Sequence, residues 1–366
     1  MTRPITALAL ALGCSTTAAY GGGFERSGLP LGFMFEKGSY GELSYGLVSP
    51  KLQGSAGGGL APTGDVGKSY ATLGLAFKTD LNDKLSLGVM LDPSFGADVA
   101  YSFPSPGPVP YPIAGTNATL NGDTIALIGR YKLNDNFSVH GGLRSVGIGG
   151  NASVAADSVI PGGVPFYSAT YDHDRAMGYL VGAAYEKPEI ALRVALTYAS
   201  ETKHDMATRV SGVPVGTEEV ELPRSLTLDA QSGIAANTLL FGSIRWVDWT
   251  STRLDSIGYP VPLQPLVGHD HDTITYTLGI GRKFNDTWSG AVSIGYEDSK
   301  GGIASNLSPT DGFWSVGVGG SYTRGNMKIS GGVRYVAIGD ADALSGAGAF
   351  RDNSALGVGV KIGFTF

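Results

Sequence analysis

Two short runs of histidine and aspartate are the side chains of this sequence best suited to holding a metal ion. They are Asp172-His173-Asp174 and His269-Asp270-His271-Asp272. Imidazole and carboxylate groups both ligate divalent metals. Adjacent residues of an extended chain point to opposite faces, however, so consecutive side chains rarely converge on one ion. We therefore predict solvated loop ends at both places and no metal site.

Motifs for catalysis are absent from the sequence. A Gly-x-Ser-x-Gly turn would indicate a serine nucleophile and a His-Glu-x-x-His helix would indicate zinc-dependent hydrolysis, and neither occurs. Serine, histidine and aspartate are present without the spacing that joins them into a catalytic unit. We predict no catalytic residue, no cofactor and no enzymatic activity.

Composition excludes other classes of protein. Of 366 residues, 56 are Gly, 42% are hydrophobic and 16% are charged, which is unlike an acidic disordered chain. The net charge is −6 and no basic cluster stands out, so no nucleic-acid partner is indicated. A single cysteine, Cys14, excludes an intramolecular disulfide framework.

The start of the chain has the features of a secretory signal peptide, which we predict over residues 1–19. Arg3 supplies the positive end, residues 5–12 are mostly apolar, and Thr17-Ala18-Ala19 offers small residues for cleavage. Cys14 leaves two interpretations open, because it is either lipidated, as in a lipoprotein, or removed with the signal. No run of about 18 apolar residues follows that would form a transmembrane helix.

The end of the chain alternates with a period of two residues. Leu356, Val358 and Val360 share one face, while Gly357 and Gly359 lie on the other. This period places successive side chains on opposite faces of a sheet. In a membrane barrel the apolar face meets lipid and the small or polar face lines the lumen.

The same alternation recurs in about 14 stretches, joined in turn by short connections and longer ones. They lie near 38–49, 66–80, 84–102, 122–133, 136–154, 170–186, 189–204, 223–235, 238–250, 272–284, 287–299, 312–323, 327–339 and 353–366. Short periplasmic turns and long external loops are typical of bacterial outer-membrane barrels. We therefore predict an all-β, antiparallel transmembrane β-barrel over residues 38–366. The alternative is a large soluble β-protein.

Three motifs resemble those of the FadL-type outer-membrane transporters of long-chain fatty acids and aromatic hydrocarbons. They are Leu222-Pro223-Arg224-Ser225-Leu226-Thr227, Ile244-Arg245-Trp246-Val247-Asp248-Trp249, and Asp92-Pro93-Ser94-Phe95-Gly96 with Tyr101. The third motif has Ser94 inserted between its proline and phenylalanine. The resemblance covers residues 38–366 and implies 14 strands, a Gram-negative outer-membrane location and passive transport of hydrophobic small molecules. Lipopolysaccharide, outer-membrane lipid and the barrel assembly machinery would be its other partners.

The N-terminus departs from that family. Its members carry a long hatch with an Asn-Pro-Ala motif, whereas here only residues 20–37 precede the first strand and the motif is absent. We predict a short hatch-like segment that sits in the lumen, through residues Glu25, Arg26, Phe33, Phe35 and Glu36. Gating as in the family is not implied by so short a segment.

Pro93 marks the predicted third strand as irregular. Proline cannot donate a ladder hydrogen bond, and a closed barrel has no edge strand to receive it. With Phe95 and Gly96 close by, we predict a local break there. The family resemblance implies that a kink at this strand opens the wall sideways for ligand to leave into the bilayer. The alternative is a bulge without a role in transport.

Two predicted external loops, 155–169 and 205–222, carry apolar residues that would capture a hydrophobic ligand. The family resemblance places a binding groove between them. The residues are Val159, Ile160, Val164, Phe166, Tyr167, Met206, Val210, Val213 and Val215. Alternatively, these side chains pack on one another and close the top of the barrel. The proline-rich stretch 104–112 would form a stiff rim.

Two other functions remain open from the sequence. A general diffusion porin would conduct ions freely through a lumen left open by the short N-terminus. A surface adhesin or structural barrel would bind a partner through its loops.

Overall fold

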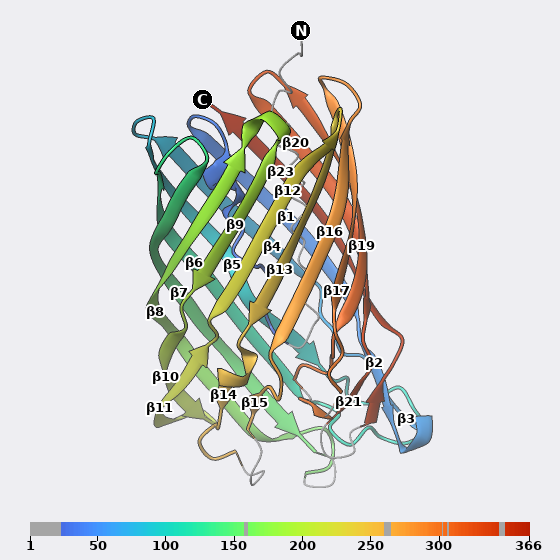
Figure 1. Cartoon of the computed structure of the whole chain (residues 1–366). Coiled ribbons are helices and arrows are strands. Elements are labelled where there is room, and N and C mark those ends of the chain that lie inside the picture. The colour runs from blue at the N-terminus through green and yellow to red at the C-terminus, as the bar shows by residue number, and fades with distance from the viewer. Residues whose placement is uncertain (1–22, 157–159, 260–264, 302, 306, 344–347) are drawn as a thin grey trace.

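The computed structural model describes residues 23–156, 160–259, 265–301, 303–305, 307–343 and 348–366. In this part of the chain fourteen antiparallel strands close into a barrel (Figure 1). The barrel strands are β1 (Tyr40–Lys51), β4 (Tyr70–Asp80), β5 (Leu85–Ala100), β6 (Asn117–Lys132), β7 (Phe137–Ala155), β8 (Pro165–Lys187), β9 (Leu192–Ala199), β12 (Ser225–Ala235), β13 (Thr238–Val247), β16 (Thr273–Lys283), β17 (Trp288–Glu297), β19 (Phe313–Arg324), β20 (Met327–Ile338) and β23 (Asn353–Thr365). Strand β1 pairs with β23, which closes the ring. The predicted all-β barrel is confirmed. The predicted signal peptide, 1–19, lies outside the described residues.

The outer surface of the barrel is apolar because each strand alternates. In β23, Leu356, Val358 and Val360 are exposed on the outside, whereas Ala355 is 2% exposed. The other barrel strands also expose large aliphatic or aromatic side chains. Aromatic pairs occur at both ends of the strands, as membrane interfaces require. They are Phe137–Tyr185 and Trp288–Tyr322 at the end with short turns, and Tyr179–Tyr198 and Trp314–Tyr335 toward the other end.

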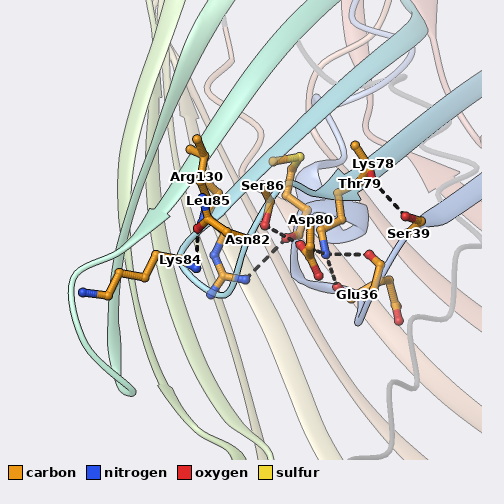
Figure 2. A network of polar contacts seen from close by, with 12 residues as sticks. Glu36, Ser39, Lys78, Thr79, Asp80, Asn82, Lys84, Leu85, Ser86 and Arg130 are labelled. Carbon is orange, nitrogen blue, oxygen red and sulfur yellow. Dashed lines mark hydrogen bonds and ion pairs between the residues drawn. The ribbon is translucent and has the colours of Figure 1, made fainter.

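Three of the short turns, at the barrel end where Phe366 lies (Figure 1), are built by asparagine. The side-chain oxygens of Asn82, Asn134 and Asn285 each accept hydrogen bonds from the two backbone N–H groups that lie two and three residues further on. Such asparagine turns reverse the chain without any apolar contact. Figure 2 shows the first of them, between β4 and β5.

The opposite end of the barrel carries the long connections, and these contain further strands. A hairpin of β10 (Thr202–Val210) and β11 (Val213–Leu222) extends β8 beyond the barrel. The prediction of a loop over 205–222 was therefore wrong, and residues 165–169 of the other predicted loop begin β8. Two small sheets complete this end: β14 (Arg253–Leu254) with β15 (Val267–Gly268), and β2 (Gln53–Ala56), β3 (Ala61–Asp65), β18 (Ile303–Ala304), β21 (Ala341–Ala343) and β22 (Gly348–Phe350).

Helical structure is confined to single turns. They are η1 (Leu31–Phe35), η2 (Gly57–Gly59), η3 (Pro188–Ile190) and η4 (Trp249–Ser251). No helix among the described residues is long and apolar enough to cross a bilayer.

Residues 23–36, here called the plug segment, run inside the barrel. In η1, Leu31, Phe33 and Met34 are buried against inward-facing residues of β5 and β6, including Met90 and Ile128. Gly88 of β5 provides the room, because a Cβ there would collide with Phe33 and Met34. The short segment thus occupies the lumen, and it does so against one side of the wall.

Candidate functional site

The ladder of β5 is interrupted at Pro93. Strands β5 and β6 stay in register up to Asp92 and again from Phe95, and between these points Pro93 and Ser94 stand opposite Asp123 alone. Two residues against one make a β-bulge, which bends the strand and locally ends regular pairing. The predicted irregularity of the third strand is therefore present as a bulge.

Beyond the bulge, β5 separates from β4. The last ladder pair joins Leu91 to Leu75, and the next contact along the strands is the bridge between Val99 and Gly67. No backbone pairing joins the described residues 69–74 to residues 92–97. This unpaired stretch, here called the wall gap, is a break in the hydrogen bonding between β4 and β5.

The plug segment pairs with the stretch of β5 that β4 leaves unpaired. The backbone N–H of Arg26 donates to the carbonyl of Ser94 at 2.7 Å, and the N–H of Gly96 donates to the carbonyl of Phe24 at 2.9 Å. Glu25 and Phe95 form the bridge between these bonds. Polar backbone at membrane depth is thereby satisfied within the protein, as a bilayer requires.

One side chain spans the wall gap. The guanidinium carbon of Arg26 lies 4.0 Å from the centre of the Tyr70 ring, so a cation–π contact joins the plug segment to β4. Gly96 is required for this arrangement, because a Cβ at its position would collide with the Arg26 guanidinium. The gap is thus occupied by a cationic side chain and not by backbone.

An apolar cavity of about 80 Å³ lies between the loop-end strands and the plug segment. Its lining includes Phe24, Leu120, Ile148, Met206, Val220 and Leu254. The ring of Phe24 lies 6.2 Å from that of Phe95 and 4.8 Å from that of Trp249, between centroids. An apolar cavity of this kind is suited to alkyl or aromatic groups.

A buried polar cluster fixes the long connection that lies over this cavity. The Ser256 hydroxyl is within 2.6 Å of the hydroxyls of both Tyr167 and Tyr171. It also donates to the carboxylate of Glu218, and the N–H of Ile257 donates to the same carboxylate at 2.6 Å. Strands β8 and β11 and residues 254–257 are thereby held together.

A second, larger cavity of about 320 Å³ lies on the other side of the plug segment. Eight charged side chains line it beside apolar ones, so it is here called the polar cavity, and Arg245 of β13 is one of the charged residues. The Arg245 guanidinium donates to both carboxylate oxygens of Glu25, at 2.9 and 2.6 Å, and to the Thr227 hydroxyl at 2.6 Å. The plug segment is therefore attached to this wall through one ion pair.

Known structures share this architecture. A FadL homologue of Pseudomonas aeruginosa aligns with a TM-score of 0.71 at 15% identity, over 92% of each chain. The toluene transporter TodX of Pseudomonas putida aligns with a TM-score of 0.62 at 14% identity, over 90% of this chain and 91% of that one. The toluene transporter TbuX of Ralstonia pickettii gives 0.61 at 14%, over 91% and 90%.

This chain has the FadL-type fold. No protein-family model matches the sequence, and no curated protein does.

Within the FadL-type barrel, the residues predicted for capture fall into two groups. Tyr167 is buried in the loop-end apolar cluster that also holds Phe95, and Phe166 and Val210 pack against that cluster. Met206 lines the cavity itself. Ile160, Val164, Val213 and Val215 are exposed, and Val159 lies outside the described residues. The sequence missed Phe24 and Leu254 as cavity residues and Ser256 as the centre of the polar cluster, since nothing local marks them.

The histidine–aspartate runs lie at the loop end of the FadL-type barrel, and side chains of the first run have charged partners. The Asp174 carboxylate contacts His204 at 3.4 Å, Arg209 pairs with Asp172, and Arg175 pairs with Asp123. Strand β10 exposes charged residues and so lies outside the lipid band, and burial there lowers the pKa of His204. Among the described residues no group of three or more His, Cys, Asp or Glu is arranged to hold a metal.

The base of the plug segment is fixed to β4 by a buried lysine (Figure 2). The Lys78 ammonium donates to the carbonyls of Glu36 and Gly38 at 2.7 and 2.9 Å and pairs with Asp80 at 2.6 Å. Burial raises the pKa of the Glu36 carboxyl, against the opposing effect of Lys328 and other nearby cations. Arg130 adds a bond to the Met34 carbonyl.

Proposed function

We propose that this protein is a passive channel for hydrophobic compounds in the outer membrane of a Gram-negative bacterium. Ligand enters the apolar cavity at the loop end and leaves through the wall gap between β4 and β5 into the bilayer. Long-chain fatty acids or small hydrocarbons are the substrate class. Residues 1–19 are removed as a signal peptide, and residues 20–37 serve as a short hatch.

The proximity of the apolar cavity to the wall gap carries this proposal. A small cavity of about 30 Å³ at the gap is lined by Arg26, Tyr70 and Gly96. It shares Phe24 and Ala97 with the apolar cavity. A ligand moving from one to the other passes the aromatic ring of Phe24 and remains beside apolar side chains.

The physical advantage of sideways release is that an alkyl chain avoids water. Each CH₂ group kept out of water is worth about 0.8 kcal/mol, so a long chain would lose far more by crossing an aqueous lumen than by entering lipid. The outer apolar band would place the gap against membrane lipid and lipopolysaccharide. The solved structures of similar fold include two toluene transporters.

The bulge gives a direct test. Replacing Pro93 by Ala and deleting Ser94 removes the extra residue and should let β5 pair regularly, which closes the wall gap. We expect uptake of labelled long-chain fatty acid or toluene to fall to the level of cells lacking the protein. Heat-modifiable mobility in gels would show that the variant barrel is folded.

The control is Pro50→Ala, the same loss of a proline from another barrel strand. It should leave uptake unchanged. Full uptake by the Pro93 variant would refute sideways release. Uptake of hydrophilic solutes only, by both variants, would favour a general porin.

A further inference from the structure

Three cavities lie in series along the wall formed by β9 to β23. A loop-end cavity of about 70 Å³ shares Thr273 and Glu297 with the polar cavity of about 320 Å³. That cavity shares Gly32, Phe35 and Arg193 with a third, of about 710 Å³, at the end with the short turns. Together they reach from the external loops to the periplasmic mouth.

We propose that these cavities form a second, hydrophilic route through the same barrel, which carries small polar solutes and salt ions between the two sides of the membrane. This route is separate from the hydrophobic one and does not depend on the wall gap. The barrel would then transport two chemically different classes of molecule along two sides of one plug segment.

The lining of the middle cavity is rich in charged and hydroxyl side chains. It contains four acidic and four basic side chains together with a row of threonines on β16. Two of these charges are fixed in the Arg245–Glu25 pair, and two in the Lys361–Glu42 pair at 3.1 Å. Because the signs balance, neither cations nor anions are excluded, and neutral or zwitterionic solutes fit as well.

Phe35 lines both the middle cavity and the one at the short-turn end. Its ring lies between two guanidinium groups, with the Arg130 carbon 4.4 Å and the Arg193 carbon 4.6 Å from the ring centre. Gly32 lies beside it and is exposed, and a Cβ added there would meet no atom within 4 Å. A side chain at position 32 therefore projects into open space at the junction of two cavities.

The plug segment leaves this side open because it is held on the other. Lys78 and the buried face of η1 fasten it to β4, β5 and β6. On the β9 to β23 side, its contacts include the Glu25–Arg245 pair and the Phe35–Arg193 stack. The asymmetry of attachment explains why neighbouring cavities remain along this side.

The test uses Gly32→Cys in the exported protein, whose single native cysteine, Cys14, leaves with the signal peptide. Purified protein is placed in planar bilayers in potassium chloride and exposed to charged, membrane-impermeant methanethiosulfonate reagents. We expect a steady current that falls sharply on labelling with either a positive or a negative reagent. Absence of current, or a current that labelling leaves unchanged, would overturn the proposal.

Two further variants keep the test decisive. Ala126→Cys is the matched control, because Ala126 is fully buried under the plug segment and should not be labelled. Phe35→Ala removes the ring that lines both cavities and should raise the current. Uptake of labelled fatty acid should be unchanged in Gly32→Cys after labelling, so failure of this route and failure of the proposed hydrophobic function give different results.

Discussion

The two halves of the lumen differ although the outside of the barrel is uniform. Along β4 to β8 the plug segment packs against buried apolar residues such as Met90 and Ile128 and is bonded to Lys78 and Arg130. Along β9 to β23 cavities remain, lined by both charged and apolar side chains. Both halves expose the same kind of aliphatic band to the outside.

The difference shows that the outward and inward faces of a barrel strand are subject to separate physical requirements. Lipid fixes the outward residue at every second position, whatever the strand. The inward residue is free to be small, charged or apolar, and a short plug segment therefore docks only where the inner face is complementary. Gly88, which makes room for Phe33 and Met34, is an example.

The largest expected effect comes from weakening the packing of the plug segment against β4 to β8. Phe33→Ala removes a ring that is 2% exposed, and we expect docking of the plug segment to weaken by about 3–5 kcal/mol. Limited proteolysis of residues 23–36 in the folded barrel measures this, because cleavage reports the undocked population. Phe284→Ala, at a ring that is 66% exposed, is the control. Equal protection of both variants would show that apolar packing does not hold the plug segment.

The next largest effect is expected at the ion pair that joins the plug segment to β13. Glu25→Gln leaves the Arg245 guanidinium without its charged acceptor, and hydrogen bonds to charged groups contribute about 1.5–3 kcal/mol. Protection of the plug segment should fall, but less than in Phe33→Ala. The double variant with Arg245→Gln should recover part of the loss, and simple additivity of the two changes would mean that the pair is not coupled.

The strands and the bulge were predictable from the sequence because their causes are local. Period-two alternation is imposed residue by residue, and Pro93 breaks pairing wherever it is placed. The β10–β11 hairpin carries a similar signal, since Thr202, His204, Met206 and Thr208 are buried in alternation. It was read as a loop because long external connections are expected there in an outer-membrane barrel.

The candidate site was less predictable because its contacts join distant parts of the chain. The bonds of residues 24–27 to β5 use backbone atoms, which any sequence provides. Ser256 meets Glu218 and Tyr167 across 38 and 89 residues, and nothing near Ser256 indicates either partner. Which inward residues fill the lumen and which leave it open depends on where the plug segment docks.

A smaller effect concerns the cluster over the apolar cavity, which has no counterpart in the open half. Ser256→Ala removes the hydroxyl between two tyrosines and Glu218. We expect a loss of about 1 kcal/mol in ligand binding, or roughly five-fold in affinity, because the connection is held less firmly. Titration with a fluorescent fatty acid measures it, with Ser308→Ala, also at this cavity, as control. Unchanged affinity would mean that the connection does not shape the cavity.

The smallest expected effect is a pH dependence at the junction of the two halves. Burial raises the pKa of Glu36, while Lys328, Lys361 and Arg193 oppose the shift and Glu42 adds to it. An acid whose pKa is raised in the folded state contributes stability below its ordinary pKa, and that contribution is lost as the pH rises through the folded value. Protection of the plug segment from proteolysis should therefore decrease modestly as the pH rises through this range. Glu36→Gln should remove the dependence, and the same pH profile in that variant would assign the effect to another group.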